Sequence, residues 1–270
     1  MRELSLEDTS LLPSTVRSRL VEPHELIAEL AADGRPIACF LDFDGTLVDI
    51  VERYDEVVVP TEVAPLLARL SERLDGALAI LSGRSFKDLD RYLNPLVLPG
   101  CGQHGLEMRL HGERVVAAGS ALVLDDFRQT VCELPRRFSG LRIEDKGLTV
   151  ALHYGDSLDA ENELLALAEA SAQGPLALRR GKRVIEIGLS GATKGAALAE
   201  LMRGPPFAGR RPVMFGDDLT DEFAFREAHA HRGLAVAVGE RVAASADVVL
   251  ADPTAVRVVL SALAGHNEEE

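Results

Sequence analysis

Cys39-Phe40-Leu41-Asp42-Phe43-Asp44-Gly45-Thr46 is the stretch that decides the fold. The apolar run Ile37–Leu41 predicts a buried strand, which ends abruptly in two carboxylates, Asp42 and Asp44, separated by one phenylalanine. Charge at the end of such a strand lies at the edge of a sheet, where open α/β folds bind their ligands. Two carboxylates two residues apart in an extended chain point to the same side and repel each other, so we expect a cation between them.

Short apolar strands alternate with amphipathic helices along most of the chain. After the first strand, helices are predicted over 62–74 and 85–92, and strands over 77–81 and 96–98. The alternation resumes near the C-terminus, with helices over 193–202, 219–228 and 254–264 and strands over 212–215, 234–238 and 248–250. This order predicts an α/β fold, with a Rossmann-like core in which crossover helices connect the strands of a parallel sheet.

Residues 118–189 follow another pattern. Helices are predicted over 124–138 and 159–170, and a hairpin follows each of them, with strands at 141–144, 148–154, 176–178 and 184–188. This order predicts an inserted α+β domain, and its glycine-containing exits suit a hinge. The core is then formed by 36–117 and 190–270. Residues 1–35 are an N-terminal extension with a short helix over 22–32, to which we assign packing and no chemistry.

Composition restricts the function classes. The chain has 270 residues and a net charge of −14, which argues against a nucleic-acid partner and means that an anionic substrate needs a locally positive pocket. Cys39, Cys101 and Cys132 have neither paired nor metal-ligand spacing and favour a reducing, cytoplasmic location. We expect no signal peptide and no membrane partner, because no apolar stretch approaches the roughly 20 residues of a membrane helix. The sequence does not define the oligomeric state, and a monomer is our working expectation.

The two aspartates at the first strand end suit phosphoryl transfer. This reaction needs an in-line nucleophile, a metal ion that neutralises charge and a proton donor for the leaving oxygen. We expect Asp42 to attack phosphorus and form an aspartyl-phosphate, and Asp44 to protonate the leaving oxygen and later deprotonate water. Thr46 and the amides after Gly45 can hold phosphate oxygens, as glycine-containing turns do.

Three further residues follow strands or begin a helix at the same predicted edge. Ser82 follows the second strand, and its hydroxyl can donate to a phosphate oxygen. Lys194 lies in the first turn of a helix after the N-cap Thr193, where a cation opposes the helix dipole and therefore suggests a functional role. Asp217 follows the strand at 212–215 and is the better magnesium ligand in an acidic run, since hard cations prefer oxygen.

Other polar residues give weaker signals. Asp218, Asp221 and Glu222 complete the acidic run; Asp221 and Glu222 also suit a first helical turn, so their contact with the metal stays open. A further group of residues lies on loops or hairpins that could face the cleft, although each alone fits a solvated surface equally well: His104, Glu107, Lys146, Lys182 and Glu186.

The order of these motifs resembles the phosphatases of the haloacid dehalogenase (HAD) superfamily, and the late insertion resembles their type-II cap. A narrower similarity, to the trehalose-6-phosphate phosphatase family, rests on Leu81-Ser82-Gly83-Arg84, Gly105-Leu106-Glu107, Gly181-Lys182 with Glu186, Lys194-Gly195 and the tract Gly216–Glu222. The resemblance implies a Mg²⁺-dependent phosphatase for a small-molecule sugar phosphate.

The resemblance also implies a role for each matching residue. Asp42 would be nucleophile and Mg²⁺ ligand, Asp44 acid/base with its backbone carbonyl on the metal, and Asp217 the remaining protein ligand. Ser82 and Lys194 would bind the transferring phosphoryl group. A last set would surround the disaccharide, partly from the inserted domain: Arg84, His104, Glu107, Lys146, Lys182 and Glu186.

The sequence departs from the family pattern at two places in the inserted domain. Tyr154 follows His153 where a basic residue is often nearby, and Gly188-Leu189 stands where Arg/Lys-Pro is usual. Four alternatives therefore stay open: a phosphatase for sucrose 6-phosphate, one for mannosyl-3-phosphoglycerate, a phosphomutase and a catalytically silent regulatory domain. The five residues Asp42, Asp44, Ser82, Lys194 and Asp217 argue against the silent domain, which does not need all of them.

Overall fold

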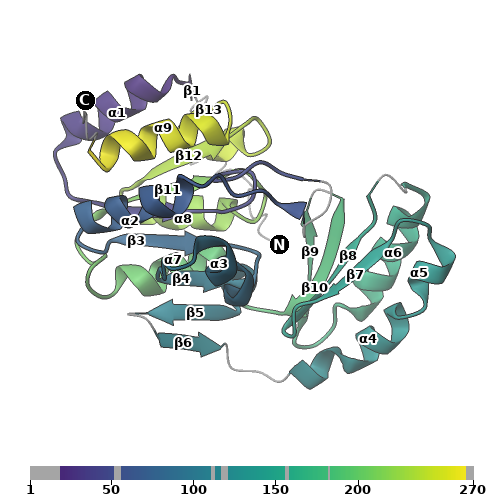
Figure 1. The fold of residues 1–270 in the computed structure, drawn as a ribbon. Helices are drawn as coiled ribbons and strands as arrows, with labels where there is room; N and C mark the ends of the chain where they lie inside the picture. Colours follow the sequence, from purple (N-terminus) through teal and green to yellow (C-terminus); the bar gives the residue numbers. More distant parts are fainter. Residues whose placement is uncertain are drawn as a thin grey trace, which may run out of the picture.

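The larger of two sheets forms the centre of the molecule. The computed structural model describes residues 19–51, 56–110, 113–116, 121–155, 158–181 and 183–265. Within these residues the larger sheet has nine strands in the order β1-β13-β12-β11-β2-β3-β4-β5-β6 (Figure 1). Neighbouring strands run parallel from β1 to β4, whereas β4, β5 and β6 pair antiparallel. The strands are β1 (Arg19–Leu20), β2 (Ile37–Leu41), β3 (Leu78–Leu81), β4 (Gly100–Gly102), β5 (Glu107–Leu110), β6 (Glu113–Val116), β11 (Arg211–Gly216), β12 (Leu234–Val238) and β13 (Val248–Leu250).

Strand β2 lies in the middle of this sheet, between β11 and β3. All five of its residues are buried, as its continuous apolar run predicts for a strand covered on both faces. From β2 the chain proceeds to β3 and β4 on one side, and after the insertion it returns to β11, β12 and β13 on the other. The strand order therefore reverses between β2 and β11, which is where open α/β sheets bind ligands.

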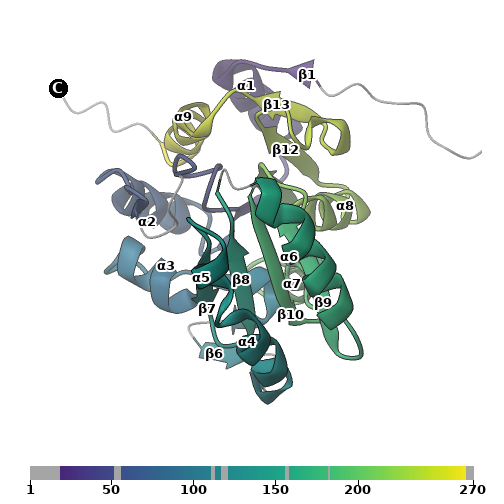
Figure 2. The same cartoon turned by 90° about the vertical axis from the view of Figure 1, so that its right-hand side faces the viewer.

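Helices cover both faces of the sheet. On one face α1 (Pro23–Asp33) and α2 (Val63–Arg73) pack against α9 (Pro253–Leu263), and on the other α7 (Lys194–Met202) packs against α8 (Glu222–Ala230) (Figure 2). The remaining core helix is α3 (Phe86–Leu93). In α2 the buried residues are Val63, Leu66, Leu67 and Leu70, which confirms the helical spacing of the sequence.

The insertion forms a separate four-stranded antiparallel sheet, which we call the cap. Its strand order is β7-β8-β10-β9, with β7 (Arg142–Asp145), β8 (Thr149–His153), β9 (Leu176–Gly181) and β10 (Val184–Leu189). Its outer face packs against α4 (Asp125–Val131), α5 (Leu134–Arg137) and α6 (Leu158–Ser171), around a hydrophobic core of its own (Figure 1). Because side chains alternate along a strand, Glu186, the polar residue of β10, faces the opposite way, toward the larger sheet.

The predicted fold class is confirmed, with a parallel α/β core and an inserted α+β unit. The domain boundaries stay predictions, and the first connection into the cap at 117–120 lies outside the described residues. Part of the N-terminal extension packs as expected, because β1 extends the sheet beside β13 and α1 packs on α9.

Two predicted elements need correction, and one element was missed. The third core strand is Gly100–Gly102 rather than 96–98; it was missed because glycine is uncommon in strands, although pairing with β3 sets this register. The helix predicted over 124–138 is two helices, α4 and α5, and Pro135 lies in the first turn of α5, where proline is tolerated. The hairpin β5–β6 was not predicted at all.

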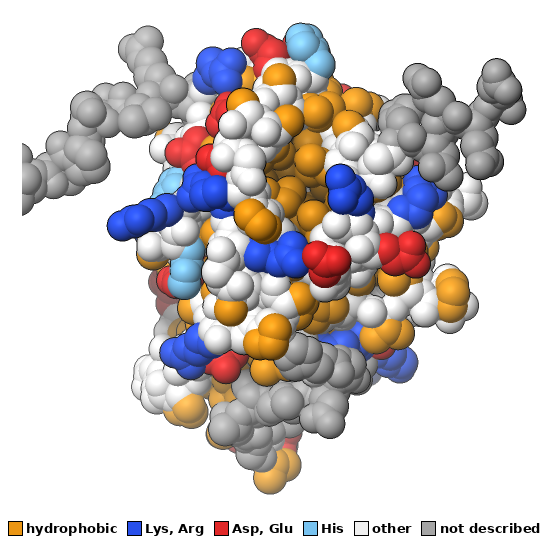
Figure 3. Space-filling model, turned by 90° about the vertical axis from the view of Figure 1, so that its left-hand side faces the viewer, with side chains coloured by type: hydrophobic (Ala, Val, Ile, Leu, Met, Phe, Trp, Pro, Cys, Tyr) orange, Lys and Arg blue, Asp and Glu red, His pale blue; other side chains and the backbone are white. Residues whose placement is uncertain are grey.

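The surface on the side of the molecule away from the cap combines charged and hydrophobic side chains. Figure 3 shows charged side chains of both signs on this face, around a hollow where hydrophobic side chains gather. Among the helices of the described ranges, none combines the length and the apolar composition needed to cross a bilayer.

Candidate active site

The carboxyl ends of three adjacent strands bring together residues that are far apart in the sequence. Asp42 follows β2, Ser82 follows β3 and Asp217 follows β11. The sheet register places Leu41 beside both Phe215 and Ile80, so the three side chains begin at the same edge of the sheet. All three are buried, with exposed fractions of 5%, 0% and 9%. The sequence-based expectation of one shared site at this edge is met in its geometry.

Lys194 connects two of the aspartates in this site. Its Nζ lies 2.8 Å from Oδ1 of Asp42 and 2.7 Å from Oδ1 of Asp221, and its side chain is 2% exposed. The position of Lys194 is set by the start of α7, where the Thr193 hydroxyl accepts a hydrogen bond from the Ala196 amide at 3.0 Å. The cation at this helix start, unfavourable for the helix dipole, is therefore held by two carboxylates.

Asp217 lies against the loop that follows β2. The Thr46 hydroxyl donates to Oδ1 of Asp217 over 3.4 Å. Gly45 has φ +80°, and a Cβ atom at this position would lie 2.2 Å from Oδ2 of Asp217. Only glycine allows both this backbone conformation and this close approach. The tight turn after Asp44 therefore leaves room for the Asp217 carboxylate.

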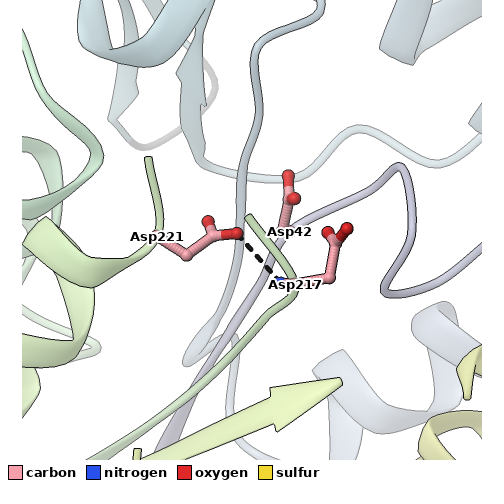
Figure 4. A group of neighbouring side chains, drawn as sticks. All are labelled: Asp42, Asp217 and Asp221. Carbon is pink, nitrogen blue, oxygen red and sulfur yellow. Dashed lines mark hydrogen bonds between the residues drawn. The ribbon is translucent and has the colours of Figure 1, made fainter. Parts of the chain in front are cut away.

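Asp42, Asp217 and Asp221 form a compact group of acids (Figure 4), with one carboxylate oxygen of each lying within 4.8 Å of the others. Three carboxylates face one ammonium here, an arrangement that a divalent cation would balance. The oxygens of Asp221 are already used, because Oδ1 contacts Lys194 and Oδ2 accepts from the amides of Asp217 and Asp218 at 3.0 and 2.9 Å. We therefore regard Asp42 and Asp217 as the better metal ligands and Asp221 as a positioning residue.

The proton affinities reflect this crowding. Burial raises the pKa of Asp42 well above its usual value, and Asp221 and Asp217 add to the effect, whereas Lys194 opposes it. Burial, together with Asp221, raises the pKa of Asp217 to about 7. Burial alone would lower the pKa of Lys194, but the Asp221 and Asp42 carboxylates raise it instead. The acids therefore repel one another without a further cation, as the sequence led us to expect for this edge.

Asp44 is held by Arg84 rather than directed into the acidic group. Nε of Arg84 donates to one carboxylate oxygen and Nη2 to the other, both at 2.7 Å, and the guanidinium lies 5.8 Å from the Phe43 ring centroid and 5.2 Å from that of Tyr92. This bidentate pair is geometrically strong. The Ser82 hydroxyl oxygen accepts from the Arg84 amide at 3.1 Å. Arg84 therefore contacts the two residues to which the sequence assigns proton transfer and phosphoryl binding.

The cap reaches the core through Lys146. Its Nζ donates to the Gly83 carbonyl at 3.1 Å and to Oε2 of Glu186 at 2.9 Å. Nε2 of His104 lies 3.7 Å from Oε1 of Glu186. Burial of His104 lowers its pKa to about 3 although Glu186 opposes this, and Lys146 lowers the pKa of Glu186 to about 2 against the effect of burial. Lys146 and Glu186 of the cap and His104 of the core, all three expected near the sugar, therefore meet at one point.

Two expected residues are not part of this meeting point. The Glu107 carboxylate accepts from the Phe86 amide at 2.7 Å and from the Gln103 side-chain amide at 3.1 Å, so both of its oxygens are occupied by the chain itself. Lys182 lies outside the described residues. Their proposed contact with a disaccharide stays a prediction.

Sequence reasoning missed several polar residues of the site. The Glu144 carboxylate accepts a hydrogen bond from Nε2 of His153 at 2.9 Å and lies 3.8 Å from Nζ of Lys146, which extends the polar group along β7 and β8. Arg179 lies on β9 beside Glu186. The signal in the sequence that could have found these residues is the alternation of side chains along the cap strands. Once the register is known, residues 144, 151, 179 and 186 share one face of the cap sheet.

A pocket of about 340 Å³ lies between cap and core next to this polar group. Its wall includes His104, Arg179 and Lys194, together with the half-exposed side chains of Leu219 and Phe223. It therefore joins the acidic end of the site to polar residues of the cap, on a scale that suits a small ligand.

Comparison with known proteins agrees with this geometry. A family model described as trehalose-phosphatase matches residues 40–252. The chain is 37% identical over 244 residues to a "Probable trehalose-phosphate phosphatase" of Sinorhizobium fredii, covering 89% of this chain and 92% of that protein. It is also 37% identical over 223 residues to the trehalose-6-phosphate phosphatase of Escherichia coli, covering 82% and 83% of the two.

A solved structure described as a trehalose-6-phosphate phosphatase related protein has the same fold. Its TM-score is 0.70 at 28% identity, over 84% of this chain and 96% of that one. The fold is therefore HAD-like, as the sequence motifs predicted. Since the family model spans most of the chain and both relatives match over most of their own length, this phosphatase belongs to the trehalose-phosphatase family.

Proposed function

We propose that the chain is a Mg²⁺-dependent trehalose-6-phosphate phosphatase that acts through an aspartyl-phosphate intermediate. The observation that carries this proposal is the Asp42 carboxylate at the reversal of strand order, within 2.8 Å of the Lys194 ammonium and beside Asp217. This is the place for an in-line attack on a phosphoryl group. The names of both 37% identical relatives support trehalose 6-phosphate as the substrate.

The donor set suits a hard divalent cation. Asp42 and Asp217 offer buried carboxylate oxygens, and the raised pKa values of both acids indicate a surplus of negative charge that a cation would relieve. We assign the side chains of Asp42 and Asp217 and the backbone carbonyl of Asp44 as the protein ligands. A bound Mg²⁺ would supply neutralisation of the charge on the transferring phosphoryl oxygens.

The chain's own residues then divide the reaction into two displacements. In the first, a carboxylate oxygen of Asp42 bonds to phosphorus while the bond from phosphorus to the sugar oxygen breaks, and Asp44 gives that oxygen a proton. In the second, Asp44 takes a proton from water, the water oxygen bonds to phosphorus and the bond to Asp42 breaks. Ser82, Lys194 and Thr46 are assigned to the phosphoryl oxygens. Asp44 has to leave Arg84 to act, so closure over substrate would rearrange this ion pair.

The cap is assigned to the sugar. Lys146, Glu186 and His104 form a polar group over the site, and we place Arg84, Glu107 and Lys182 with it as expected from the family resemblance. Hydrogen-bonding groups of this kind discriminate strongly between sugars, because a wrong hydroxyl pattern leaves buried polar groups unpaired. A cytoplasmic location and a monomeric state complete the proposal.

Phosphate release from a panel of sugar phosphates tests this function. Purified full-length protein with Mg²⁺ should release phosphate from trehalose 6-phosphate at a kcat/KM well above that for sucrose 6-phosphate, mannosyl-3-phosphoglycerate or glucose 6-phosphate, and an excess of chelator should stop it. Preference for another member of the panel would overturn the substrate assignment. Release that persists in chelator would overturn the Mg²⁺ dependence, and no release from any compound would favour a regulatory domain.

A further inference from the structure

Arg179 on β9 is a partly buried cation that the phosphoryl chemistry does not use. Its Nη2 donates to the Leu189 carbonyl at 2.8 Å and to the Ala192 carbonyl at 3.2 Å. These two carbonyls flank Ser190 and Gly191, the connection from the cap into α7. The two hydrogen bonds of Arg179 Nη2 therefore hold β9 of the cap against the beginning of the segment that carries Lys194.

The other terminal nitrogen of Arg179, Nη1, makes no such hydrogen bond to the described residues. Nη1 is buried and has no hydrogen-bond partner within the part of the chain that the structure describes. Burial of the guanidinium lowers its pKa, and only Glu186 acts in the opposite direction. A buried donor without a partner is unfavourable, because it loses its hydrogen bonds to water, so an arginine kept in this position suggests a partner that arrives with a ligand.

A hydrogen-bond acceptor that is likewise buried and without a partner among the described residues lies on the strand paired with β9, opposite Arg179. Arg179 and Glu186 are directly paired across β9 and β10, so their side chains share the face of the cap sheet that looks toward the core. Oε1 of Glu186 is also buried and lacks a hydrogen-bond partner among the described residues. A sugar hydroxyl donates one hydrogen bond and accepts others, and therefore can satisfy an arginine N–H and a carboxylate oxygen together.

The backbone of β10 leaves space for this guanidinium at a specific residue. A Cβ atom on Gly188 would lie 2.8 Å from Nη1 of Arg179 and 2.5 Å from Cγ2 of Thr149. Any larger residue at position 188 would therefore have to displace both side chains. Gly188 is also the position at which this sequence lacks the basic residue of its family pattern.

We infer that Arg179 is a specificity-determining residue, which reaches from β9 into the space above Gly188 and donates its free N–H to a hydroxyl of the substrate sugar shared with Glu186. The inference rests on the proposed function and deepens it. Arg179 also lines the pocket of about 340 Å³ that adjoins Lys194, so the same ligand can reach both cations.

Steady-state kinetics of full-length Arg179→Met with Mg²⁺ tests this. The variant should lose about ten- to a hundredfold in kcat/KM for trehalose 6-phosphate, mainly through KM, because a hydrogen bond to a charged donor contributes about 1.5–3 kcal/mol. Turnover of p-nitrophenyl phosphate, which has no sugar, should change less than about twofold. Arg137→Met removes an exposed cap arginine that pairs with Glu163, and it should leave kcat/KM unchanged for both substrates.

A second pair of variants separates recognition from structure. Arg179→Ala should lose activity toward trehalose 6-phosphate. Arg179→Ala combined with Gly188→Arg and Thr149→Ser should recover part of it, because the arginine at 188 returns a cation to the emptied space and the serine lacks the Cγ2 atom that would lie 2.5 Å from the new Cβ. Equal losses on both phosphates, or no recovery, would show that Arg179 only holds the connection to α7 and would overturn the inference. Unchanged kinetics in Arg179→Met would overturn it as well. A wild-type protein inactive on trehalose 6-phosphate would contradict both the inference and the proposed function. An active wild type whose Arg179→Met variant has unchanged kinetics would contradict the inference alone.

Discussion

Among single residues, Lys194 has the greatest influence on the electrostatics of the site. Its ammonium lies between Asp42 and Asp221 and is almost completely buried, so removal leaves three neighbouring carboxylates without a cation from the chain. Breaking a buried ion pair by deleting one partner costs about 3–5 kcal/mol, because the remaining charge stays buried and unpaired.

We therefore expect Lys194→Met to lower the free energy of unfolding by about 3 kcal/mol in metal-free buffer and to abolish turnover. Urea unfolding followed by circular dichroism measures the first effect and phosphate release the second. Lys87→Met, at an exposed position in α3, is the matched control and should change neither. A Lys194→Met variant as stable as the wild type would show that the carboxylates do not depend on this ammonium.

His104 makes the stability depend on pH. Burial lowers its pKa from 6.5 to about 3, so between these values the unfolded chain binds a proton that the folded chain does not. Stability due to this residue is therefore complete above pH 6.5 and is lost as the pH falls toward 3. Glu186 acts in the same direction, but only below pH 4.5, because its pKa is lowered from 4.5 to about 2.

Between pH 4.5 and 6.5 Glu186 does not contribute, but Asp217, with its pKa raised to about 7, holds a proton there in the folded chain and not in the unfolded one, so the effect of His104 is the difference in slope between wild type and variant. His104→Asn should lower the slope of the unfolding free energy against pH there by up to about 1.4 kcal/mol per pH unit, the full effect of one proton. Asparagine is chosen because His104 has φ +58°, which asparagine tolerates. Chemical unfolding at several pH values gives the slope, and His24→Asn, at an exposed position, serves as control. An unchanged slope would mean that His104 binds its proton normally in the fold.

At the scale of elements, we propose that the cap sheet carries the surface that binds the sugar. Glu186 on β10 contacts Lys146, approaches His104 and pairs across the strands with Arg179, so its carboxylate is the centre of the polar face. None of these contacts reaches the phosphoryl end of the site, where Asp42, Ser82 and Lys194 lie. Loss of Glu186 should therefore affect the sugar and leave the phosphoryl group bound as before.

Glu186→Gln should lower kcat/KM for trehalose 6-phosphate at least about tenfold, since a neutral amide replaces a charged acceptor. The effect on p-nitrophenyl phosphate should be small. Parallel kinetics with the two substrates makes the comparison, with Glu163→Gln on the outer helix α6 as the control. Equal losses for both substrates would remove the cap from sugar recognition.

How far the sequence predicted these elements depended on local pattern. Apolar runs that end in polar residues located β2, β3 and β11, and with them Asp42, Ser82 and Asp217. The glycine strand β4 and the partners of Arg84 could not be found in this way, because sheet pairing and a contact 40 residues away determine them. Asp221 was left undecided as a first-turn acid, and only the three-dimensional structure shows its contacts with Lys194 and two amides.

The whole molecule divides the work between its two sheets. The strand order of the larger sheet gathers the acids and Lys194 at one edge, and the cap sheet presents its polar face to the same place (Figure 1). Contacts from Lys146 to the Gly83 carbonyl and from Arg179 to the Leu189 and Ala192 carbonyls join the cap to that edge. This arrangement supports the proposal that the core carries out the reaction and that the cap, which the sequence predicts as a separate unit over 118–189, binds the sugar.

The most direct measurement compares wild type and Asp42→Asn for phosphate release from trehalose 6-phosphate with Mg²⁺ present. The substitution removes the carboxylate that we propose as the nucleophile with almost no change of shape, so we expect the variant to fold and to release phosphate at least about a thousandfold more slowly, as loss of a catalytic nucleophile does. Asp126→Asn, at an exposed position in α4, should retain wild-type turnover. A folded Asp42→Asn protein that keeps a substantial part of the wild-type rate would contradict the account.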